Sequence, residues 1–433
     1  MTYDVAIVGA GVTGTALLHV LTRYTDVGSV ALLERYRDVA QVNSKSTANS
    51  QTLHFGDIET NYSPEKARKV SVASRRVVRY LKNAGREGIH QVHSKMVLGV
   101  GEAEVDGLRL RHLALKEIFP ELELLDRAKL ARTEPAVVEG RPKDVPLAAL
   151  RSSEGLAVDF GRLSTSFVMD ARESGKRFDS FFGVQVASIT RRGKHFHVDA
   201  GEAQVDAKTV VAAAGGMSLV FAHALDLGLE YAVLPVAGDF FNAPRVLNGK
   251  VYTVQDDRLP FAAVHGDPDT NDPNVTRFGP TARVLPLLER GRWMSFLGFL
   301  RSTRFDPLLA FRLCGLLADD AIRGFAAKNA LYSVPWIGRR LFADEVRKIV
   351  PTLDADSLTP TPWPGGIRPQ LVDRRTGKLH MGEAKIVGDR ILFDVTPSPG
   401  ASVCLKNAED DARLVAGWLG LSFDEASFAR DYS

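Results

Sequence analysis

A glycine-rich turn close to the N-terminus constrains the fold more than any other feature of this sequence. Residues 3–8 are an apolar run of strand length, residues 9–14 contain the pattern Gly-x-Gly-x-x-Gly, and residues 13–23 carry the apolar spacing of a helix. A second apolar run, residues 30–33, ends at Glu34. This order of strand, glycine turn, helix, strand and acid predicts a Rossmann-type dinucleotide site.

The three glycines of this turn have separate physical roles. Gly9 allows the tight turn, Gly11 lets a pyrophosphate approach the backbone, and Gly14 lets the helix pack close to the strand. Free N–H groups at the helix N-terminus suit the phosphates, and Glu34 is placed to accept hydrogen bonds from a ribose diol. Arg35 could indicate a 2′-phosphate, but beside Glu34 we interpret it as a solvated charge at the cofactor site. The cofactor contacts expected here are Gly9, Ala10, Gly11, Val12, Thr13, Gly14, Glu34 and Arg35.

The same turn serves FAD and NAD, so the choice between them depends on later segments. Residues 184–189, 195–198 and 209–214 predict a three-stranded meander whose last strand runs into two glycines. Two-domain flavoproteins use this arrangement, and residues 396–401 predict a second turn that opens a helix toward an anion or the flavin edge. We therefore expect FAD as the cofactor. The contacts expected from these segments are Val186, Ala214, Gly215, Pro399, Gly400, Ala401 and Ser402.

The composition is that of an ordinary globular protein. The chain has 433 residues, 45% of them hydrophobic and 25% charged, which excludes disorder and coiled coil as the main architecture. A net charge of +3 is too small to indicate nucleic acid, and Cys314 and Cys404, expected to be buried, form no metal-binding cluster. No apolar run approaches the ~18 residues of a spanning helix, and no cleavable leader is visible. We therefore expect no metal and a cytoplasmic protein, soluble or attached to a membrane surface.

Several segments spread along the whole chain carry a family resemblance. They are residues 49–54, 56–62, 64–67, 234–238, 250–254, 259–267, 277–281, 366–370 and 396–401. Together they resemble the shorter type of FAD-dependent malate:quinone oxidoreductase, and more broadly the superfamily of D-amino-acid oxidase and L-2-hydroxyglutarate dehydrogenase. The resemblance implies L-malate as substrate and a membrane quinone as electron acceptor. It also implies peripheral attachment to the inner face of the cell membrane.

The resemblance implies a reaction in which a base takes the hydroxyl proton of an L-2-hydroxy acid while flavin N5 takes the C2 hydride. His265, which precedes Gly266-Asp267, is our preferred base, because an imidazole suits proton removal at neutral pH; His54 is the second candidate. Arg368 would bind the α-carboxylate bidentately at the flavin, and Arg277 is a candidate for the second carboxylate, with a surface role equally open. Gln51 and His54 could contact the flavin, the substrate or its second carboxylate. The further cofactor contacts expected are Asn49, Ser50, Gln51, Thr52, Gly366 and Arg368.

The expected fold class is α/β, in the two-domain class of glutathione-reductase-like flavoproteins. The Rossmann-type FAD domain takes residues 1–83, 148–218 and 362–433. An interleaved substrate domain, a mixed sheet with helices and α+β elements, takes residues 84–147 and 219–361. Residues 285–350 mix apolar stretches with arginines, which suits either an anionic membrane interface or core helices with solvated arginines.

Three other functions stay open at this point. The first keeps the fold and changes the substrate to L-2-hydroxyglutarate or lactate, since function depends on the site rather than the fold. The second is an amino-acid or sarcosine oxidase that uses O2. The third belongs to another class, a non-catalytic protein that binds a dinucleotide as structure or sensor.

Overall fold

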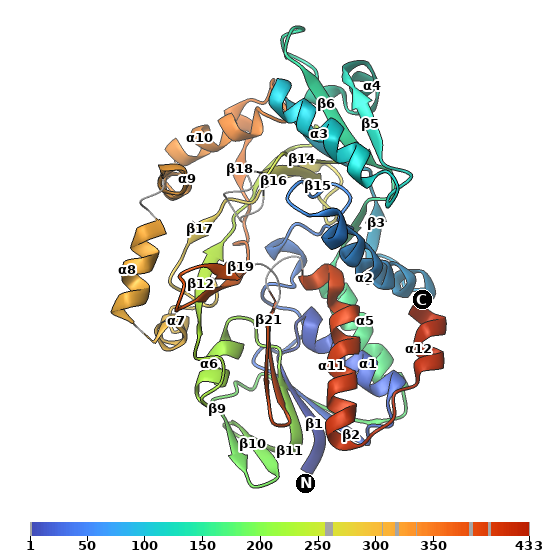
Figure 1. The fold of residues 1–433 in the computed structure, drawn as a ribbon, viewed down its shortest axis with the longest axis vertical. Helices are drawn as coiled ribbons and strands as arrows, with labels where there is room; N and C mark the ends of the chain where they lie inside the picture. Colours follow the sequence, from blue (N-terminus) through green and yellow to red (C-terminus); the bar gives the residue numbers. More distant parts are fainter. Residues whose placement is uncertain are drawn as a thin grey trace.

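The computed structural model describes residues 2–255, 263–304, 306–316, 320–334, 336–380, 384–396 and 400–432. The expected cofactor contact Pro399 and the first part of the segment 259–267 lie outside the described residues. One sheet and its helices form the end of the molecule that contains the N-terminus, and a second sheet forms the opposite end (Figure 1).

The first sheet is built around the N-terminal strand. Strands β8, β2, β1, β11 and β22 are parallel in that order, β21 joins one edge antiparallel, and β9 and β10 extend β11 as the expected meander. Val5 and Ile7 face one hydrophobic core while Ala6 and Val8 face another, so both faces of the sheet are buried, as in doubly wound folds. The bounds are β1 (Thr2–Val8), β2 (Ser29–Glu34), β8 (Arg177–Phe182), β9 (Ser188–Arg192), β10 (His195–Ala200), β11 (Ala203–Ala212), β21 (Ala384–Gly388) and β22 (Ile391–Val395).

Helices cover both faces of this sheet. On one face α1 lies between α5 and α11, and α2 and α12 pack outside them (Figure 1). The side chain of Ser63 accepts a hydrogen bond from Lys66 N and Pro64 occupies the first turn, so α2 begins where its capping residues predict. The bounds are α1 (Val12–Tyr24), α2 (Pro64–Asn83), α5 (Phe160–Glu173), α6 (Met217–His223) on the other face, α11 (Cys404–Leu419) and α12 (Glu425–Tyr432).

The second large sheet is mixed, in the order β18, β13, β16, β15, β14, β4, β6 and β5, with a parallel pair at β14 and β4. Residues 148–152, expected in the nucleotide-binding part, lie in this sheet, because β6 pairs with β4 and β5. The strand bounds are β4 (Lys95–Val100), β5 (Glu123–Asp126), β6 (Leu147–Ser152), β13 (Phe241–Pro244), β14 (Lys250–Thr253), β15 (His265–Pro268), β16 (Val275–Gly279) and β18 (Thr359–Pro360). The helices of this part are α3 (Glu102–Leu115), α4 (Arg127–Thr133) and α10 (Ile337–Val346).

A four-stranded sheet lies between the two large sheets, in the order β17, β12, β19 and β20. Strand β19, expected in the nucleotide-binding part, pairs instead with β12 of the preceding segment. The bounds are β12 (Tyr231–Ala237), β17 (Arg283–Val284), β19 (Ile367–Asp373) and β20 (Leu379–His380), with α7 (Ser295–Thr303), α8 (Pro307–Leu316) and α9 (Asp320–Leu331) alongside; β3 (His90–Val92) and β7 (Leu156–Val158) form a separate pair.

Two properties of the helices bear on the sequence-based expectations. Within the described ranges, no helix is long and apolar enough to cross a membrane. Cys404 is buried in α11, as expected, whereas Cys314 is exposed. The expectation for Cys314 was wrong because α8 packs on the four-stranded sheet through Leu309, and Cys314 lies well round the helix from that residue.

Candidate active site

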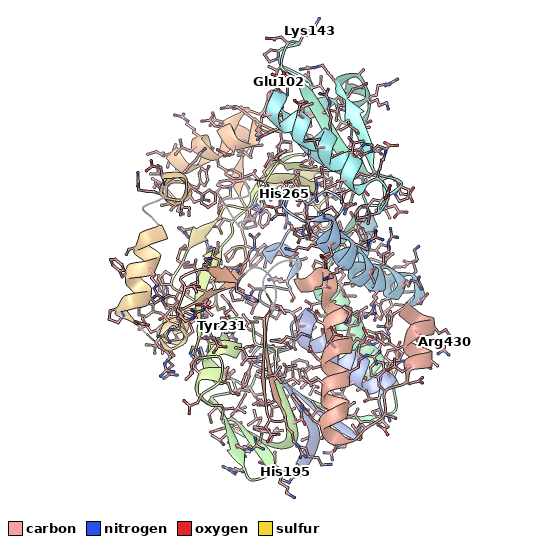
Figure 2. All side chains as sticks on the ribbon, viewed as in Figure 1. Glu102, Lys143, His195, Tyr231, His265 and Arg430 are labelled. Atoms are coloured by element: carbon pink, nitrogen blue, oxygen red, sulfur yellow. The ribbon has the colours of Figure 1, made fainter. Side chains whose placement is uncertain are left out.

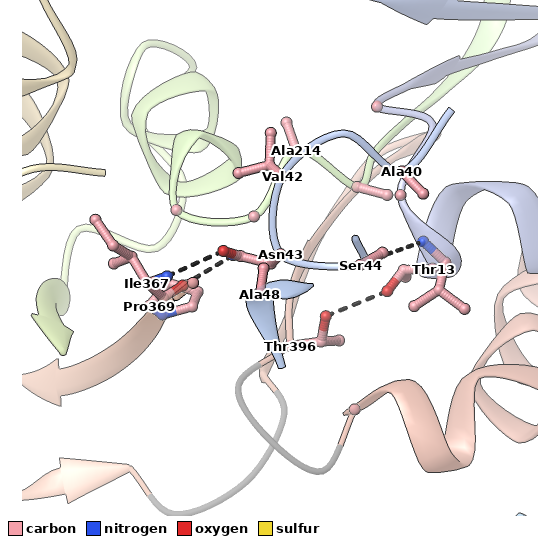
Figure 3. A pocket seen from close by; sticks show the side chains of 18 of the residues that line it. Thr13, Ala40, Val42, Asn43, Ser44, Ala48, Ala214, Ile367, Pro369 and Thr396 are labelled. Carbon is pink, nitrogen blue, oxygen red and sulfur yellow. Dashed lines mark hydrogen bonds between the residues drawn. The ribbon is translucent and has the colours of Figure 1, made fainter. Parts of the chain in front are cut away.

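A long pocket runs between the glycine turn and the four-stranded sheet (Figure 3). It contains about 1790 Å³ of space, its open mouth included. Its lining extends from Glu34, beside the glycine turn, to His54 and Arg368, so groups that suit a nucleotide and groups that suit an acid share one pocket. The expected cofactor residues that line it are Gly9, Gly11, Val12, Thr13, Glu34, Arg35, Asn49, Ser50, Thr52, Val186, Ala214, Gly215, Gly366, Arg368, Gly400, Ala401 and Ser402, whereas Ala10, Gly14 and Gln51 lie behind its walls.

The glycine turn fits a pyrophosphate for a reason visible at each glycine. Gly9 has φ 106°, and a Cβ there would lie 2.5 Å from Ala213 O. A Cβ on Gly14 would clash with Gly9 O, so these two glycines are needed by the fold itself. A Cβ on Gly11 would meet only Ser44 Oγ, at 3.4 Å. The missing side chain of Gly11 therefore keeps space open in the pocket, where a phosphate could approach the start of α1.

Two polar residues that the sequence analysis missed hold the walls of the pocket together (Figure 3). Ser44 Oγ accepts a hydrogen bond from Val12 N at 3.0 Å, at the start of α1. The side chain of Asn43 donates to Ile367 O at 2.8 Å and accepts from Ile367 N at 3.0 Å. Asn43 thereby fixes the first residue of β19, directly before Arg368. Their position shortly after the second strand was the available signal, because that loop has to pass the cofactor.

Glu34 and Arg35 lie at the end of the pocket that suits a nucleoside. Glu34 Oε2 accepts from Ala10 N at 2.8 Å and Oε1 from Tyr36 N at 3.0 Å, so its carboxylate is fixed beside the glycine turn. Arg35 was expected to be a solvated charge, but it forms an ion pair with Glu289. Glu289 is buried and also accepts a hydrogen bond from the Tyr36 hydroxyl. Arg35 therefore ties the end of β2 to the segment that precedes α7.

His54 lines the opposite part of the pocket and is oriented by a carboxylate. Its Nδ1 lies 2.6 Å from Glu59 Oε1, and its backbone N–H donates to Ser402 Oγ at 3.0 Å. Burial alone would raise the pKa of Glu59, but the hydrogen bond and charge of His54, with the charge of Lys95, lower that pKa to about 2. Glu59 is therefore ionised at neutral pH and can accept a hydrogen bond from Nδ1–H of His54. In a neutral imidazole, that tautomer has Nε2 as its acceptor nitrogen. Glu59 is a third residue that the sequence analysis missed.

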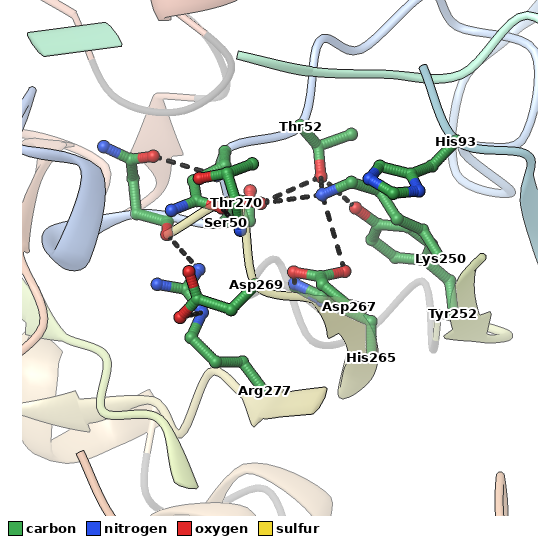
Figure 4. Close-up of polar contacts among 12 residues, drawn as sticks. Ser50, Thr52, His93, Lys250, Tyr252, His265, Asp267, Asp269, Thr270 and Arg277 are labelled. Carbon is green, nitrogen blue, oxygen red and sulfur yellow. Dashed lines mark hydrogen bonds and ion pairs between the residues drawn. The ribbon is translucent and has the colours of Figure 1, made fainter. Parts of the chain in front are cut away.

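His265, our preferred base, is absent from the described lining of the pocket. It is 2% exposed and stacks on Tyr252 with ring centroids 4.4 Å apart (Figure 4). Its Nδ1 lies 3.1 Å from Ala263 O, and its Nε2 lies 3.4 Å from Asp267 Oδ2. Both ring nitrogens thus face protein groups, so the geometry favours His54 for a reaction in the pocket.

Buried cations hold the loop that carries Ser50 and Thr52 (Figure 4). Lys250 Nζ donates to Ser50 O at 3.0 Å and to Thr52 Oγ1 at 3.1 Å, and Thr52 Oγ1 is 2.5 Å from the Tyr252 hydroxyl. Lys250 is fully buried, and its desolvation lowers its pKa, against the opposing attraction of Asp267. Residues 250–254 carry the family resemblance, but that resemblance assigned no role to Lys250.

Gln51 and Arg277 serve the same loop rather than the pocket surface. Arg277 Nη2 donates to Asn49 O at 2.7 Å, and its guanidinium lies over the ring of Phe240. The Gln51 side chain donates to Ser46 O at 3.1 Å, and its backbone has φ 57°. Both side chains are buried, so neither reaches the pocket as a substrate ligand in this structure.

Arg368 lies on β19 opposite Val236 and lines the pocket. Desolvation by the surrounding protein lowers the pKa of Arg368 to about 10, so the guanidinium is still charged at neutral pH. Across the part of the chain that the structure describes, no hydrogen bond or ion pair engages this guanidinium, which leaves it available to an anion. The same residues contain no cluster of His, Cys, Asp and Glu that could hold a metal ion.

Comparisons with known proteins identify the family. A model of the FAD dependent oxidoreductases matches residues 4–400. A probable malate:quinone oxidoreductase of Campylobacter jejuni is 40% identical over 99% of this chain and 98% of its own, and the malate:quinone oxidoreductase of Helicobacter pylori strain J99 is 39% identical over 100% and 98%. The chain belongs to the FAD-dependent malate:quinone oxidoreductase family. The expected resemblance, fold class and cofactor are thereby confirmed.

Solved structures give the same fold at lower sequence identity. L-α-glycerophosphate oxidase from Mycoplasma pneumoniae, with FAD bound, superposes with a TM-score of 0.69 at 18% identity over 96% of this chain and 95% of that one. Glycine oxidase from Geobacillus kaustophilus gives 0.66 at 19% identity over 99% and 98%. At these identities the two structures support the architecture alone, a two-domain FAD oxidoreductase.

Proposed function

We propose that this protein oxidises L-malate to oxaloacetate and passes the electrons to a membrane quinone. The observation that carries the proposal is that His54 and Arg368 line the same pocket as the glycine turn. Glu59 orients His54, and the guanidinium of Arg368 has no partner among the described residues. When bound, FAD supplies the hydride acceptor of the first half-reaction and the electron donor of the second. The names of the relatives at 40% and 39% identity support malate as the acid and a quinone as the acceptor.

Arg368 binds the C1 carboxylate of the substrate. Its planar guanidinium can donate two parallel hydrogen bonds to a carboxylate, which fixes the orientation of the adjacent C2–H bond. Two hydrogen bonds between the Asn43 side chain and the backbone of Ile367, together with the pairing of β19 with β12, hold this part of the strand in place. A carboxylate held in one position would also hold C2 toward the flavin, which lowers the entropic cost of reaching the reactive orientation.

His54 takes the hydroxyl proton at Nε2. His265 stacks on Tyr252, whose hydroxyl contacts Thr52 of the pocket lining. Glu59 holds Nδ1–H and stabilises the imidazolium that forms, because a carboxylate with a pKa of about 2 stays ionised throughout the reaction. This assignment replaces the preference for His265. The same arrangement would serve other L-2-hydroxy acids, so the choice of malate depends on the test below.

We also propose that the protein attaches to the cytoplasmic face of the cell membrane. Quinones reside in the bilayer, so a protein without a membrane-crossing helix in its described part has to meet its acceptor at the surface.

The deciding experiment is an anaerobic titration of the purified protein followed by visible spectroscopy. We expect the oxidised flavin absorption to bleach with L-malate, and to persist with D-malate and L-2-hydroxyglutarate. Flavin absorption that persists with L-malate would overturn the substrate. Bleaching by L-2-hydroxyglutarate, lactate or an amino acid would then name the alternative, and a flavin that no acid reduces would point to a non-catalytic binding protein.

A further inference from the structure

Helices α7 to α10 follow one another along one side of the molecule, beside the four-stranded sheet (Figure 1). Large apolar side chains in these helices, or directly before α7 and α10, are exposed: Trp293, Met294, Phe296, Phe311, Trp336 and Ile337. We propose that this docking face binds the surface of a lipid bilayer that carries anionic headgroups. Its role in delivering quinone rests on the proposed function, whereas lipid binding itself does not.

The exposure of these side chains is unusual for a soluble surface. Trp293 and Trp336 are each 80% exposed and Phe311 is 76% exposed, although large aromatic side chains are normally well buried. The sequence has four tryptophans, so two of them lie on this face. Tryptophan and phenylalanine beside arginine are the residues that partition into the interface of a bilayer. Contact with water alone gives no physical reason for so many exposed aromatic side chains on one group of helices.

The charge of the same segment selects the kind of partner. Residues 285–346, which end with α10, contain nine Lys or Arg and six Asp or Glu. Arg290, Arg323, Lys328 and Arg339 pair with carboxylates, whereas Arg301, Arg304 and Arg340 have no acidic partner among the described residues. One of those acids, Glu289, is buried in its ion pair with Arg35, while Arg301 and Arg340 are exposed. A basic face is attracted to anionic lipid and would repel a second copy of itself.

Helices α7 and α8 pack on the rest of the protein, which holds the docking face in place. Leu309 of α8 packs on Ala232 and Val372 of the four-stranded sheet. Gly298 of α7 packs on the wall of the pocket, because a Cβ there would lie 2.9 Å from Met217 Sδ and 3.0 Å from Leu288 Cδ1.

Met217 and Leu288 both line the cofactor pocket. A single helix layer therefore separates the exposed residues at the start of α7 from the pocket. Docking through this face would bring a quinone ring at the bilayer surface close to the flavin site.

The test is co-sedimentation of the FAD-loaded protein with phosphatidylcholine vesicles, with and without phosphatidylglycerol. We expect binding that requires phosphatidylglycerol and weakens with salt, and a blue shift of tryptophan emission on binding. The double variant Trp293→Ser/Trp336→Ser should bind roughly tenfold or more weakly, because two interfacial aromatic anchors are lost. Its reduction by L-malate with a water-soluble dye should be unchanged, and its rate with vesicle-embedded quinone should fall by a similar factor.

The matched control is Leu110→Ser/Leu113→Ser on α3. These leucines are also exposed and lie outside the docking face, on α3, which begins at Glu102, at the opposite end of the molecule from His195 (Figure 2). Equal vesicle binding by the tryptophan variant and the wild type would overturn the docking face. A wild-type dimer in solution that the tryptophan variant abolishes would overturn it in favour of a second copy. Vesicle binding without reduction by malate would overturn the proposed function and support the docking face.

Discussion

At the scale of single residues, the orientation of two imidazoles is our reason for proposing His54 rather than His265 as the base. His54 has one nitrogen on Glu59 and lines the pocket, whereas both nitrogens of His265 face protein groups. We expect His54→Gln to slow anaerobic flavin reduction by roughly 10²–10⁴-fold, the usual contribution of a general base. His265→Gln should slow it less than about tenfold, and both variants should retain flavin. Stopped-flow absorbance measures both rates, and the opposite ranking would restore His265 as the base.

The carboxyl of Glu59 gives a prediction about acid. Burial would raise its pKa, but its interactions with His54 and Lys95 lower it from 4.5 to about 2. A carboxyl whose pKa is lowered in the folded state adds stability that is complete above pH 4.5 and is lost as the pH falls toward 2. Glu59→Gln should therefore lower the free energy of unfolding by about 1–3 kcal/mol at pH 7, and by less near pH 3. Urea unfolding at the two pH values measures this, and a constant difference would contradict it.

At the scale of elements, the turn between β1 and α1 separates two uses of glycine. Gly11 has φ −71°, which suits any residue, and its missing Cβ faces the pocket, whereas a Cβ on Gly14 would clash with Gly9 O. We expect Gly11→Ala to keep the thermal stability of the flavin-free protein while losing most bound FAD. Gly14→Ala should destabilise the flavin-free protein by about 1–3 kcal/mol, as overpacking does. Thermal unfolding and the ratio of flavin to protein absorbance distinguish the two, and a Gly11 variant that retains FAD would contradict the pyrophosphate assignment.

The same turn shows which elements a sequence can predict. Strand, glycines, helix and acid are contiguous between residues 2 and 34, so local spacing was sufficient to predict them and the doubly wound sheet. Strands β6 and β19 pair with strands of segments that we expected in the other domain, because sheet pairing depends on partners far along the chain. The site followed the same rule. The Gly- and Pro-bounded segment predicted a position for Arg368 at the cofactor site, and Arg368 lines the pocket. The choice between His54 and His265 depends on side-chain direction, which sequence spacing does not contain.

At the scale of the whole molecule, the cofactor pocket depends on segments that are distant in sequence. Its lining runs from Val8 to Ser402. It includes Ile367, Arg368 and Pro369 of β19 and Gly238, which directly follows β12. Arg35, at the end of β2, and Glu289, just before α7, are tied by a buried ion pair that no local pattern in the sequence indicates. This pair connects the nucleoside end of the pocket to the segment that also bears the docking face.

The pair of Arg35 and Glu289 should therefore control how long FAD stays bound. Glu289→Gln keeps the shape of the side chain but leaves the largely buried Arg35 without its charge partner, and such a loss is strongly destabilising. We expect FAD to dissociate about tenfold faster or more, while the rate of flavin reduction by malate in the loaded variant changes little, because His54 and Arg368 are untouched. Asp356→Asn, which removes the partner of Arg339 in an exposed ion pair, is the matched control and should leave FAD dissociation unchanged. Recovery of flavin fluorescence on dilution measures the dissociation rate, and equal rates in Glu289→Gln and the wild type would mean that the pair serves the fold alone.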